Sequence, residues 1–454
     1  MMPAGLDTVA RTGDGREMGW VNRLFNREGN TPEYQELKFT LHRKLLDRIN
    51  LEALSSMAGE RVRTEIRSAV ARLVDEEKTP LSLVEKDRVI EEILDEVFGL
   101  GPLEPLLQDP TVSDILVTGP RLVYVERGGK LYRTSVEFKD DAHLLRIIEK
   151  IVSRVGRRVD ESSPLVDARL PDGSRVNAAI PPVAVDGPLL SIRRFGRTGM
   201  RGEDLVAKMA LTEGMLELLK ACVKARLNIL ICGGTGSGKT TLLNALSSYI
   251  PEDERIVTIE DAAELRLQQT HVARMETRPA NVEGAGAIHI RQLVINALRM
   301  RPDRIIVGEV RAEEALDMLQ AMNTGHDGSL TTIHANTPRD GLGRLEVMVG
   351  MANSNMGVRS IRQQVAAAVN LFVQVARFSD GSRRVTHITE VVGMEQDIIT
   401  LQDIFLFEKT GIVEFGRVLG RFRATGIRPR FCERLKACGV NMPPQLFQTV
   451  VEIN

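Results

Sequence analysis

The sequence predicts an α/β protein whose C-terminal half contains a largely parallel sheet, preceded by a mixed α+β domain and an N-terminal helical bundle. From residue 204 onward, buried-type apolar runs at 227–231, 256–259 and 305–307 alternate with helical segments, which is typical of parallel sheets. Shorter strand-like runs surround Gly-Pro and Gly-Gly turns between residues 103 and 197. Further upstream, apolar residues recur at three- and four-residue steps, which indicates helices.

In chain order, residues 1–34 are rich in Gly, Arg, Asp and Asn without periodicity, and we expect a flexible tail there. The helical bundle is expected over 35–102, and the α+β domain over 103–197. Residues 198–203 form the predicted linker, with Gly196, Gly199 and Gly202 as its hinge points. The predicted nucleotide-binding domain covers 204–454 and includes a hairpin-like stretch at 371–392.

Composition narrows the functional class. The 454 residues carry 60 Lys and Arg against 61 Asp and Glu, so no charge excess points to a nucleic acid partner. The four cysteines show neither CxxC pairs nor a disulfide framework, which favours a reducing cytoplasm. No run approaches the roughly 20 apolar residues that a membrane span needs, so we expect membrane association to be peripheral and mediated by partners.

The most specific motif is a glycine-rich loop that matches GxxxxGK[ST] between a predicted strand and a predicted helix. Its glycines allow backbone N–H groups to converge on phosphate oxygens, and the helix N-terminus adds its dipole. We expect Lys239 to reach the β and γ phosphates of ATP and Thr240 to bind Mg²⁺. The predicted cradle consists of Gly233, Gly234, Thr235, Gly236, Ser237, Gly238, Lys239, Thr240 and Thr241.

Acidic residues follow two of the predicted buried strands. Glu309 ends the strand at 305–307 and is expected to reach Mg²⁺ or the attacking water, although Gly308 occupies the position where an aspartate is usual. Glu260 and Glu264 follow the strand at 256–259, where a carboxylate can orient or deprotonate water. A solvated acidic turn remains the alternative for this pair.

Two histidines and a cluster of arginines complete the predicted site. His326 and His334 lie in Ser- and Thr-rich segments, where a histidine can bind a γ-phosphate, although a structural role is the alternative for each. Arginines gather before the linker, and such residues can close over a triphosphate from the other domain or from a neighbouring subunit. These are Arg169, Arg175, Arg193 and Arg194.

Together these motifs resemble the Walker A, Asp-box, Walker B and His-box signature of the secretion-ATPase superfamily, most closely at 301–311 and 319–336. Segments 155–161, 168–177 and 386–391 resemble CpaF-type ATPases of Tad/Flp pili. The resemblance covers residue 35 to the end, with Ala312 where glycine is expected. It implies a RecA-like ATPase domain, a PAS-like domain before it, a hexameric ring and polytopic platform proteins of the inner membrane as partners.

The same resemblance assigns roles to individual residues. It implies that Glu264 is the catalytic base, Glu260 the first Asp-box glutamate and Glu309 the Walker B acid. Arg175 and Arg194 are the residues that it implies complete the nucleotide site. The chain lacks the four-cysteine zinc module of many type II secretion ATPases, which argues against that branch.

Three alternatives to a pilus motor remain open. A type IV secretion or conjugation ATPase would share all of these motifs. A nucleotide-gated scaffold would bind ATP without turnover, and the intact Lys239, Glu264 and Glu309 argue against it. A small-molecule P-loop kinase would need an acceptor-binding lid, for which the sequence shows no candidate.

Overall fold

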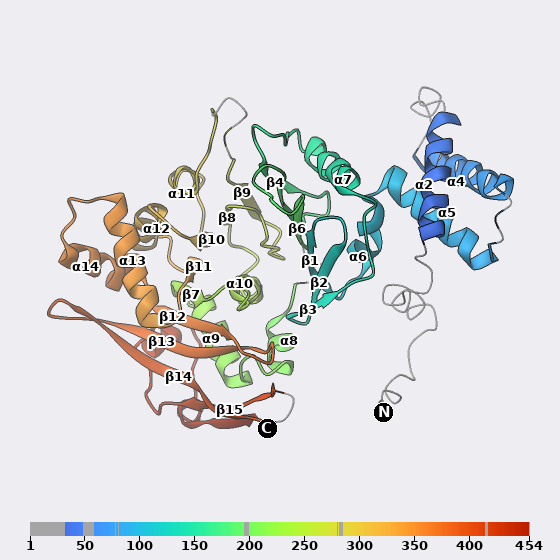
Figure 1. Ribbon diagram of the computed structural model, residues 1–454. Helices are drawn as coiled ribbons and strands as arrows, with labels where there is room; N and C mark the ends of the chain where they lie inside the picture. The colour runs from blue at the N-terminus through green and yellow to red at the C-terminus, as the bar shows by residue number, and fades with distance from the viewer. Residues whose placement is uncertain are drawn as a thin grey trace. The chain divides into compact units, whose positions relative to one another are not determined.

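The computed structural model describes residues 32–48, 59–77, 79, 81–194, 199–278, 280, 285–413 and 416–453. The chain divides into two compact units, Met1–Gly196 and Arg197–Asn454 (Figure 1). The predicted tail falls almost wholly outside the described residues. Within the described residues, no helix has both the length and the apolar character needed to cross a membrane.

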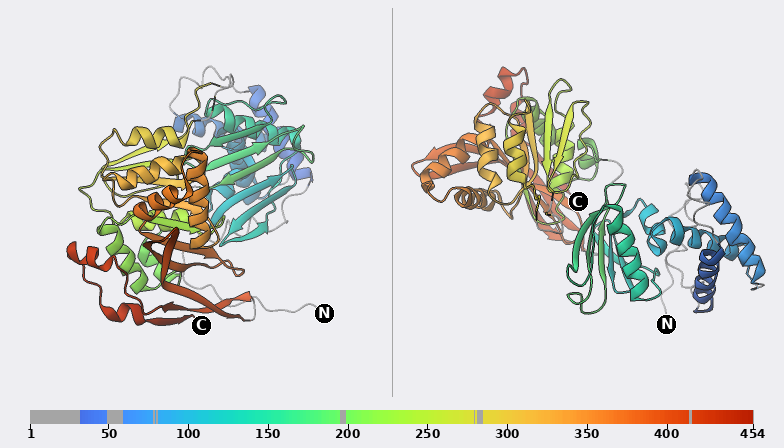
Figure 2. Two further views of the ribbon diagram at one scale, coloured as in Figure 1. Left: turned by 90° about the vertical axis from the view of Figure 1, so that its left-hand side faces the viewer. Right: turned by 90° about the horizontal axis from the view of Figure 1, so that it is seen from above.

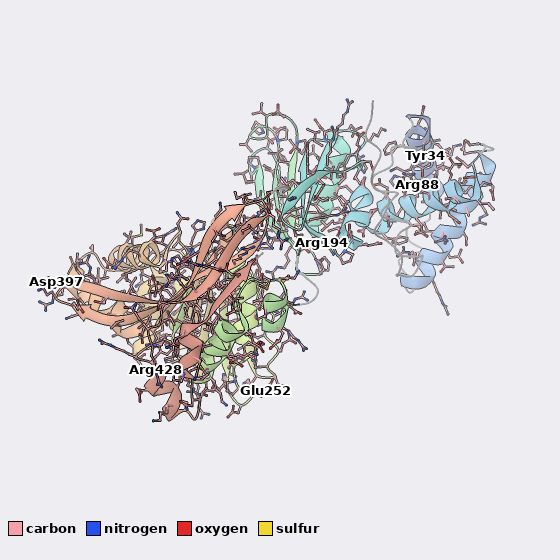
Figure 3. The ribbon with its side chains drawn as sticks, turned by 90° about the horizontal axis from the view of Figure 1, so that it is seen from below. Tyr34, Arg88, Arg194, Glu252, Asp397 and Arg428 are labelled. Atoms are coloured by element: carbon pink, nitrogen blue, oxygen red, sulfur yellow. The ribbon has the colours of Figure 1, made fainter. Side chains whose placement is uncertain are left out.

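Unit 1 begins with three helices: α2 (Pro32–Arg48), α4 (Gly59–Glu76) and α5 (Leu83–Phe98). Their apolar faces form one core that includes Leu41, Val70 and Ile93. Helix α5 starts at a capping box in which Ser82 and Glu85 exchange hydrogen bonds. The Arg88 guanidinium lies 5.2 Å from the centroid of the Tyr34 ring, and both residues belong to this bundle (Figure 3).

The rest of unit 1 is a six-stranded antiparallel sheet in the order β3-β2-β1-β6-β5-β4, covered on one face by α7 (Asp141–Arg154) (Figure 2). Short helices η1 (Gly101–Leu103) and α6 (Glu104–Gln108) lead into it. Burial alternates along the strands, so one face packs against α7 and the other is exposed. The strands are β1 (Val112–Thr118), β2 (Leu122–Arg127), β3 (Lys130–Arg133), β4 (Leu165–Arg169), β5 (Arg175–Ala179) and β6 (Leu189–Arg193).

Unit 2 is built on a ten-stranded sheet in the order β16-β15-β14-β13-β12-β7-β11-β10-β8-β9. The six strands from β12 to β9 in this order are parallel, and β13 to β16 extend the sheet antiparallel. The parallel strands are β7 (Ile229–Gly233), β8 (Ile256–Glu260), β9 (Val272–Glu276), β10 (Arg304–Val310), β11 (Leu330–His334) and β12 (Leu371–Arg377). The antiparallel strands are β13 (Arg383–Glu395), β14 (Ile398–Ile412), β15 (Val418–Ala424) and β16 (Val450–Ile453).

Helices cover both faces of this sheet, as the parallel strands require because they are apolar on both sides. One core contains residues of α9 (Glu213–Lys224) and α10 (Lys239–Ser247), and the other contains residues of α12 (Glu314–Asn323) and α13 (Pro338–Ala352). The predicted α/β fold with its parallel sheet is therefore confirmed. The remaining helices are α8 (Gly202–Ala207), α11 (Ile290–Ala297), α14 (Val358–Ala368), α15 (Cys432–Ala437) and η3 (Pro444–Gln448).

The glycines of the predicted linker differ in their surroundings. Gly202 is buried at the start of α8, and a Cβ there would overlap the Tyr249 hydroxyl and the Leu216 side chain. Close packing therefore explains Gly202 better than hinge motion does. Gly199 has open space where its Cβ would lie, and Gly196 is outside the described residues.

Candidate active site

The glycine-rich loop connects the end of β7 to the start of α10. Gly236 and Gly238 have φ angles of +68° and +99°, in the left-handed region that favours glycine. A Cβ on Gly233 would lie 2.6 Å from the carbonyl oxygen of Val375, so β12 leaves no room for a side chain at the start of the loop. Within the loop, Ser237 Oγ donates to Gly234 O at 2.9 Å. Left-handed backbone therefore explains Gly236 and Gly238, and the close neighbouring strand explains Gly233.

Lys239 folds back over this loop. Its Nζ donates to Gly233 O at 3.0 Å and to Gly234 O at 3.1 Å, and it lies 4.0 Å from Glu309 Oε1. Thr240 and Thr241 follow in the first turn of α10, where the helix N-terminus favours anions. The arrangement places a cation and a helix dipole together, as triphosphate binding requires.

Four adjacent parallel strands bring the other candidate residues to this edge of the sheet. β7, β11, β10 and β8 are neighbours, so their carboxyl ends meet. Glu260 ends β8, Glu309 lies near the end of β10, and His334 ends β11 directly beside Gly233 in the strand register. Thr332 Oγ1 donates to Gly308 O at 2.7 Å and links β11 to β10 just before Glu309.

Glu260 is a buried carboxyl group, with only 3% of the residue exposed. Its Oε1 accepts hydrogen bonds from the backbone N–H groups of Glu264 at 2.7 Å and Leu265 at 2.9 Å. Burial raises the pKa of Glu260 from 4.5 to about 7. Its Oε2 is buried and has no hydrogen-bond partner within the described part of the chain.

The packing around Gly308 explains why the usual aspartate is absent from this position of β10. A Cβ at this position would lie 2.9 Å from Glu260 Cγ, so the Glu260 side chain occupies the space that a side chain at 308 would need. The acidic function shifts to Glu309, the next residue. Glu264 is partly exposed in the segment whose backbone wraps the Glu260 carboxylate, and Glu260 thereby positions it.

Arg311 is a residue near the site that the sequence analysis assigned no role. Its Nη2 and Nε lie 2.6 and 2.9 Å from Glu309 Oε2, and its Nη1 lies 3.4 Å from Asp261 Oδ2. Its place two residues after the acid of β10 was the available signal. The Arg311 guanidinium therefore pairs with Oε2 of Glu309, whereas Lys239 approaches its Oε1.

His326 lies apart from this group. It precedes β11, whereas His334 ends that strand, and five extended residues span about 16 Å. Ser329 Oγ donates to His326 O at 2.8 Å, and Asn228 Oδ1 accepts from the N–H groups of Gly328 and Ser329 at 2.9 and 3.0 Å. The prediction grouped both histidines at one phosphate, but the structure places them at opposite edges of the sheet.

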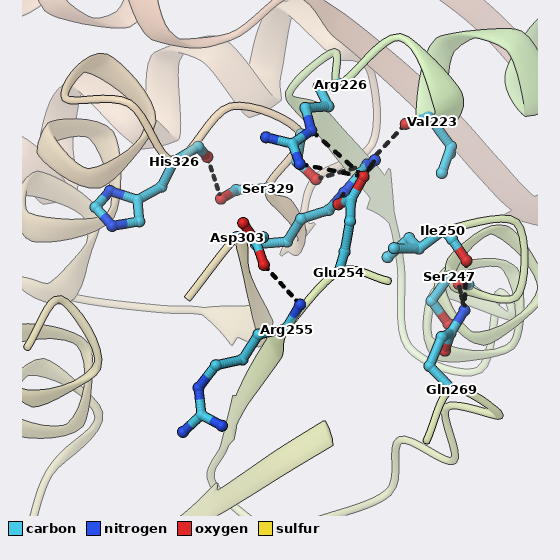
Figure 4. A network of polar contacts seen from close by, with 12 residues as sticks. Val223, Arg226, Ser247, Ile250, Glu254, Arg255, Gln269, Asp303, His326 and Ser329 are labelled. Carbon is cyan, nitrogen blue, oxygen red and sulfur yellow. Dashed lines mark hydrogen bonds and ion pairs between the residues drawn. The ribbon is translucent and has the colours of Figure 1, made fainter. Parts of the chain in front are cut away.

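The edge that holds His326 is organised by a buried ion pair. Arg304 is fully buried, and its Nη2 lies 3.0 Å from Glu254 Oε1 while its Nη1 donates to Val223 O at 2.7 Å. Arg226 reaches the same Glu254 oxygen at 3.3 Å, and Figure 4 shows this network beside His326 and Ser329. Buried charges of this kind are paired because an isolated one is costly, so a structural role fits this edge.

In unit 1, the strand register aligns three of the predicted arginines. Arg169 of β4 pairs with Arg175 of β5, and Arg175 pairs with Arg193 of β6, so their side chains form a row on one face of the sheet. At the end of the row, Arg193 Nε lies 3.2 Å from Asp114 Oδ1. The arrangement concentrates positive charge on the exposed face.

Arg194 directly follows β6 and makes different contacts. Its Nη1 donates to the backbone carbonyls of Asp109 and Val112, the latter at 3.3 Å, which ties β6 to the segment before β1. Arg194 therefore makes contacts within unit 1 and is not part of the arginine row, whereas Arg193 is, and both stay candidates for a contact with nucleotide. Successive side chains of a strand point to opposite faces, and the sequence does not show which face is polar.

The carboxyl edge offers oxygen ligands for a magnesium ion delivered with a nucleotide. The Thr240 hydroxyl, the Glu309 carboxylate and the unpartnered Oε2 of Glu260 are of the type that Mg²⁺ prefers. Among the described residues, no cluster of three or more His, Cys, Asp or Glu side chains forms a metal cage. Mg²⁺ in phosphate sites commonly uses one or two carboxylates together with phosphates and waters, so these residues fit it.

Comparison with known proteins shows which family this chain belongs to. The family model described as type II/IV secretion system protein matches residues 96–411. A Mycobacterium tuberculosis protein, named provisionally as a conjugal transfer protein, is 42% identical over 299 residues, covering 64% of this chain and 84% of its own. The conjugal transfer protein TrbB of Rhizobium radiobacter is 33% identical over 291 residues, covering 63% and 86%.

The VirB11 ATPase from the Brucella suis type IV secretion system is a solved structure that also matches. It shares 28% identity with this chain and covers 65% of this chain and 97% of its own. The TM-score is 0.34.

Proposed function

This chain is an ATPase that belongs to the type II/IV secretion system protein family, and we propose that it is a ring-shaped motor that powers assembly of Tad/Flp-type pili. The observation that carries the proposed mechanism is the meeting of Lys239, Glu260 and Glu309 at one sheet edge. Nucleotide hydrolysis needs a cation that binds the phosphates, a carboxylate that binds the metal ion and an acidic residue that orients the attacking water.

Each residue has a proposed role. The backbone of residues 233–241 and Lys239 bind the phosphates, and Lys239 exchanges the Gly233 and Gly234 carbonyls for phosphate oxygens. Thr240 and Glu309 hold Mg²⁺, which offsets the negative charge that develops on the phosphates. Glu264 is the proposed base that orients or deprotonates water, and Glu260 positions its backbone. His334 is the histidine proposed to contact phosphate.

We further propose that the active species is a hexamer in which arginines of unit 1 complete a nucleotide site. The row formed by Arg169, Arg175 and Arg193 supplies concentrated positive charge for this purpose. Supplying such a charge to the transition state typically raises the rate by about 10³–10⁵. The proposed domain divisions remain 35–102, 103–197 and 204–454, with motion at the 198–203 linker converting hydrolysis into work.

The pilus assignment is supported by the segments at 155–161, 168–177 and 386–391, which resemble CpaF-type ATPases. It implies work at the cytoplasmic face of the inner membrane, on platform proteins of that membrane. Conjugation or type IV secretion is the second candidate, because the M. tuberculosis and TrbB relatives carry conjugal transfer names and match over most of their length.

Deletion of the gene, followed by complementation with wild type or with Glu264→Gln, separates the two candidates. We expect surface pili to disappear on deletion and to return with wild type only, while plasmid transfer frequency is unchanged. Loss of plasmid transfer with normal piliation would instead establish the conjugation role. Phosphate release by the purified wild-type protein measures the ATPase activity independently.

A further inference from the structure

A groove of about 460 Å³ runs along one face of α13 in unit 2. Arg311 is one of its lining residues. The others include residues of α13 at spacings that share one helix face: Arg339, Gly343, Arg344, Val347 and Met351. Val347 and Met351 are 61% and 64% exposed, which is unusual for side chains of this kind lying one helical turn apart. Apart from the backbone of its own helix, nothing among the described residues lies within 4 Å of the position where a Cβ of Gly343 would be, so a larger side chain has room there.

The groove carries an excess of positive charge. Arg339 Nη1 donates to Ile399 O at 3.2 Å, and Arg344 Nη1 donates to His334 O at 2.6 Å. Carbonyl oxygens orient these guanidinium groups but do not neutralise them. Asp340 supplies the one carboxylate among the residues that line the groove. Arg311 is already paired with Glu309 and Asp261, so Arg339 and Arg344 carry the excess of positive charge. A ligand that complements this surface therefore combines carboxylates with apolar side chains.

The groove is connected to the nucleotide site through two of its arginines. Arg311 Nη2 donates to Glu309 Oε2 at 2.6 Å, and Arg344 Nη1 donates to the backbone carbonyl of His334. A carboxylate that enters the groove competes with Glu309 for Arg311. Once Arg311 moves, Glu309 is available to the metal ion or to water.

We propose that this α13 groove docks an acidic segment of a partner protein that also carries apolar side chains, and that docking stimulates ATP hydrolysis by drawing Arg311 away from Glu309. The stimulation rests on the proposed role of Glu309, whereas the docking does not. A peptide is favoured over an anionic membrane surface because the apolar residues follow a single helix face beside the arginines.

The docking is tested with a displayed library of random 12-residue peptides, selected on the full-length protein. Selected peptides should combine Asp or Glu with Leu, Met or Phe. A synthetic copy whose acids are changed to Gln should bind at least about tenfold more weakly, which corresponds to about 1.4 kcal/mol of binding free energy. Gly343→Trp fills the groove from an exposed position, and Val347→Glu adds a carboxylate that repels an acidic peptide. Both variants should weaken peptide binding about tenfold or more while keeping the basal rate of hydrolysis.

The proposal fails if the selected peptides show no preference for acids, or if the peptide binds both variants as well as it binds wild type. Binding of phosphatidylglycerol vesicles that is lost in both variants, without peptide binding, would assign the groove to lipid instead. The peptide should raise the wild-type hydrolysis rate several-fold, and binding without stimulation would overturn the coupling to Glu309. A wild-type protein that binds the peptide but never hydrolyses ATP would contradict the proposed motor, not the docking site.

Discussion

Replacing Glu260 by glutamine should stabilise the protein at alkaline pH and change its stability little at acidic pH. Burial raises the pKa of this carboxyl group from 4.5 to about 7, so the folded protein retains a proton that the unfolded chain has lost. The contribution of Glu260 to the stability of the wild type therefore falls as pH rises from about 4.5 to about 7, and stays lower above that range. A glutamine carries no charge, and its Oε1 can still accept from the N–H groups of Glu264 and Leu265.

The size of the effect follows from the two pKa values. Because a shift of one pKa unit corresponds to about 1.4 kcal/mol, a pKa moved from 4.5 to about 7 destabilises the ionised native state by about 3 kcal/mol. At pH 8 the full penalty applies to the wild type. At pH 5 most of the Glu260 carboxyl groups in the folded protein are protonated, and the difference from glutamine falls below about 1 kcal/mol.

Thermal unfolding of both proteins at pH 5 and pH 8 measures this difference. For a unit of this size, about 3 kcal/mol corresponds to a Tm that is about 6–12 °C higher for Glu260→Gln at pH 8. The measurement at pH 5 is the internal control, because any packing change caused by the amide acts at both pH values. A variant that is equally or less stable than wild type at pH 8 would show that the native site stabilises ionised Glu260, and the reasoning would be refuted.

Three further predictions concern hydrolysis. Lys239→Ala should abolish or greatly weaken ATP hydrolysis because the β and γ phosphates lose their cation, and wild-type phosphate release would exclude the P-loop role. Glu264→Gln should bind ATP and retain it unhydrolysed in a filter assay. Glu309→Gln should instead raise the Mg²⁺ concentration needed for turnover. Normal hydrolysis by Glu264→Gln would show that another acid is the base. Arg193→Ala should keep ATP binding and lose about 10³-fold or more in rate, whereas Arg194→Ala should mainly lower the Tm; full activity of a dilute monomer, or a silent Arg193→Ala, would contradict the proposed ring.

Much of unit 2 could be predicted because its signals are local. The loop at 233–240 needs left-handed glycines between a strand and a helix, and all of these requirements lie within consecutive residues. The apolar runs that became β7, β8 and β10 are buried on both faces, so composition alone distinguished them. Acids placed just after such strands meet at one edge in any parallel sheet, which is why Glu260 and Glu309 were found together.

Other features depended on partners distant in the chain. Gly308 carries no acid because Glu260, 48 positions earlier, occupies the space beside it. The antiparallel extension by β14 to β16 was not predicted, since its pairing partners are set by strand register rather than by local pattern. The link from Arg344 to the carbonyl of His334 likewise requires the folded packing of α13.

Residue type and spacing predicted a phosphate-binding loop and the acids beside it, because such a loop and the strands next to it are encoded by short continuous segments. The fold distinguished Arg193 from Arg194 and separated His326 from His334. Both distinctions depend on how the strands pair and at which end of a strand a residue lies. These are relations between segments, and they exist only once hydrogen bonding across the sheet fixes the register.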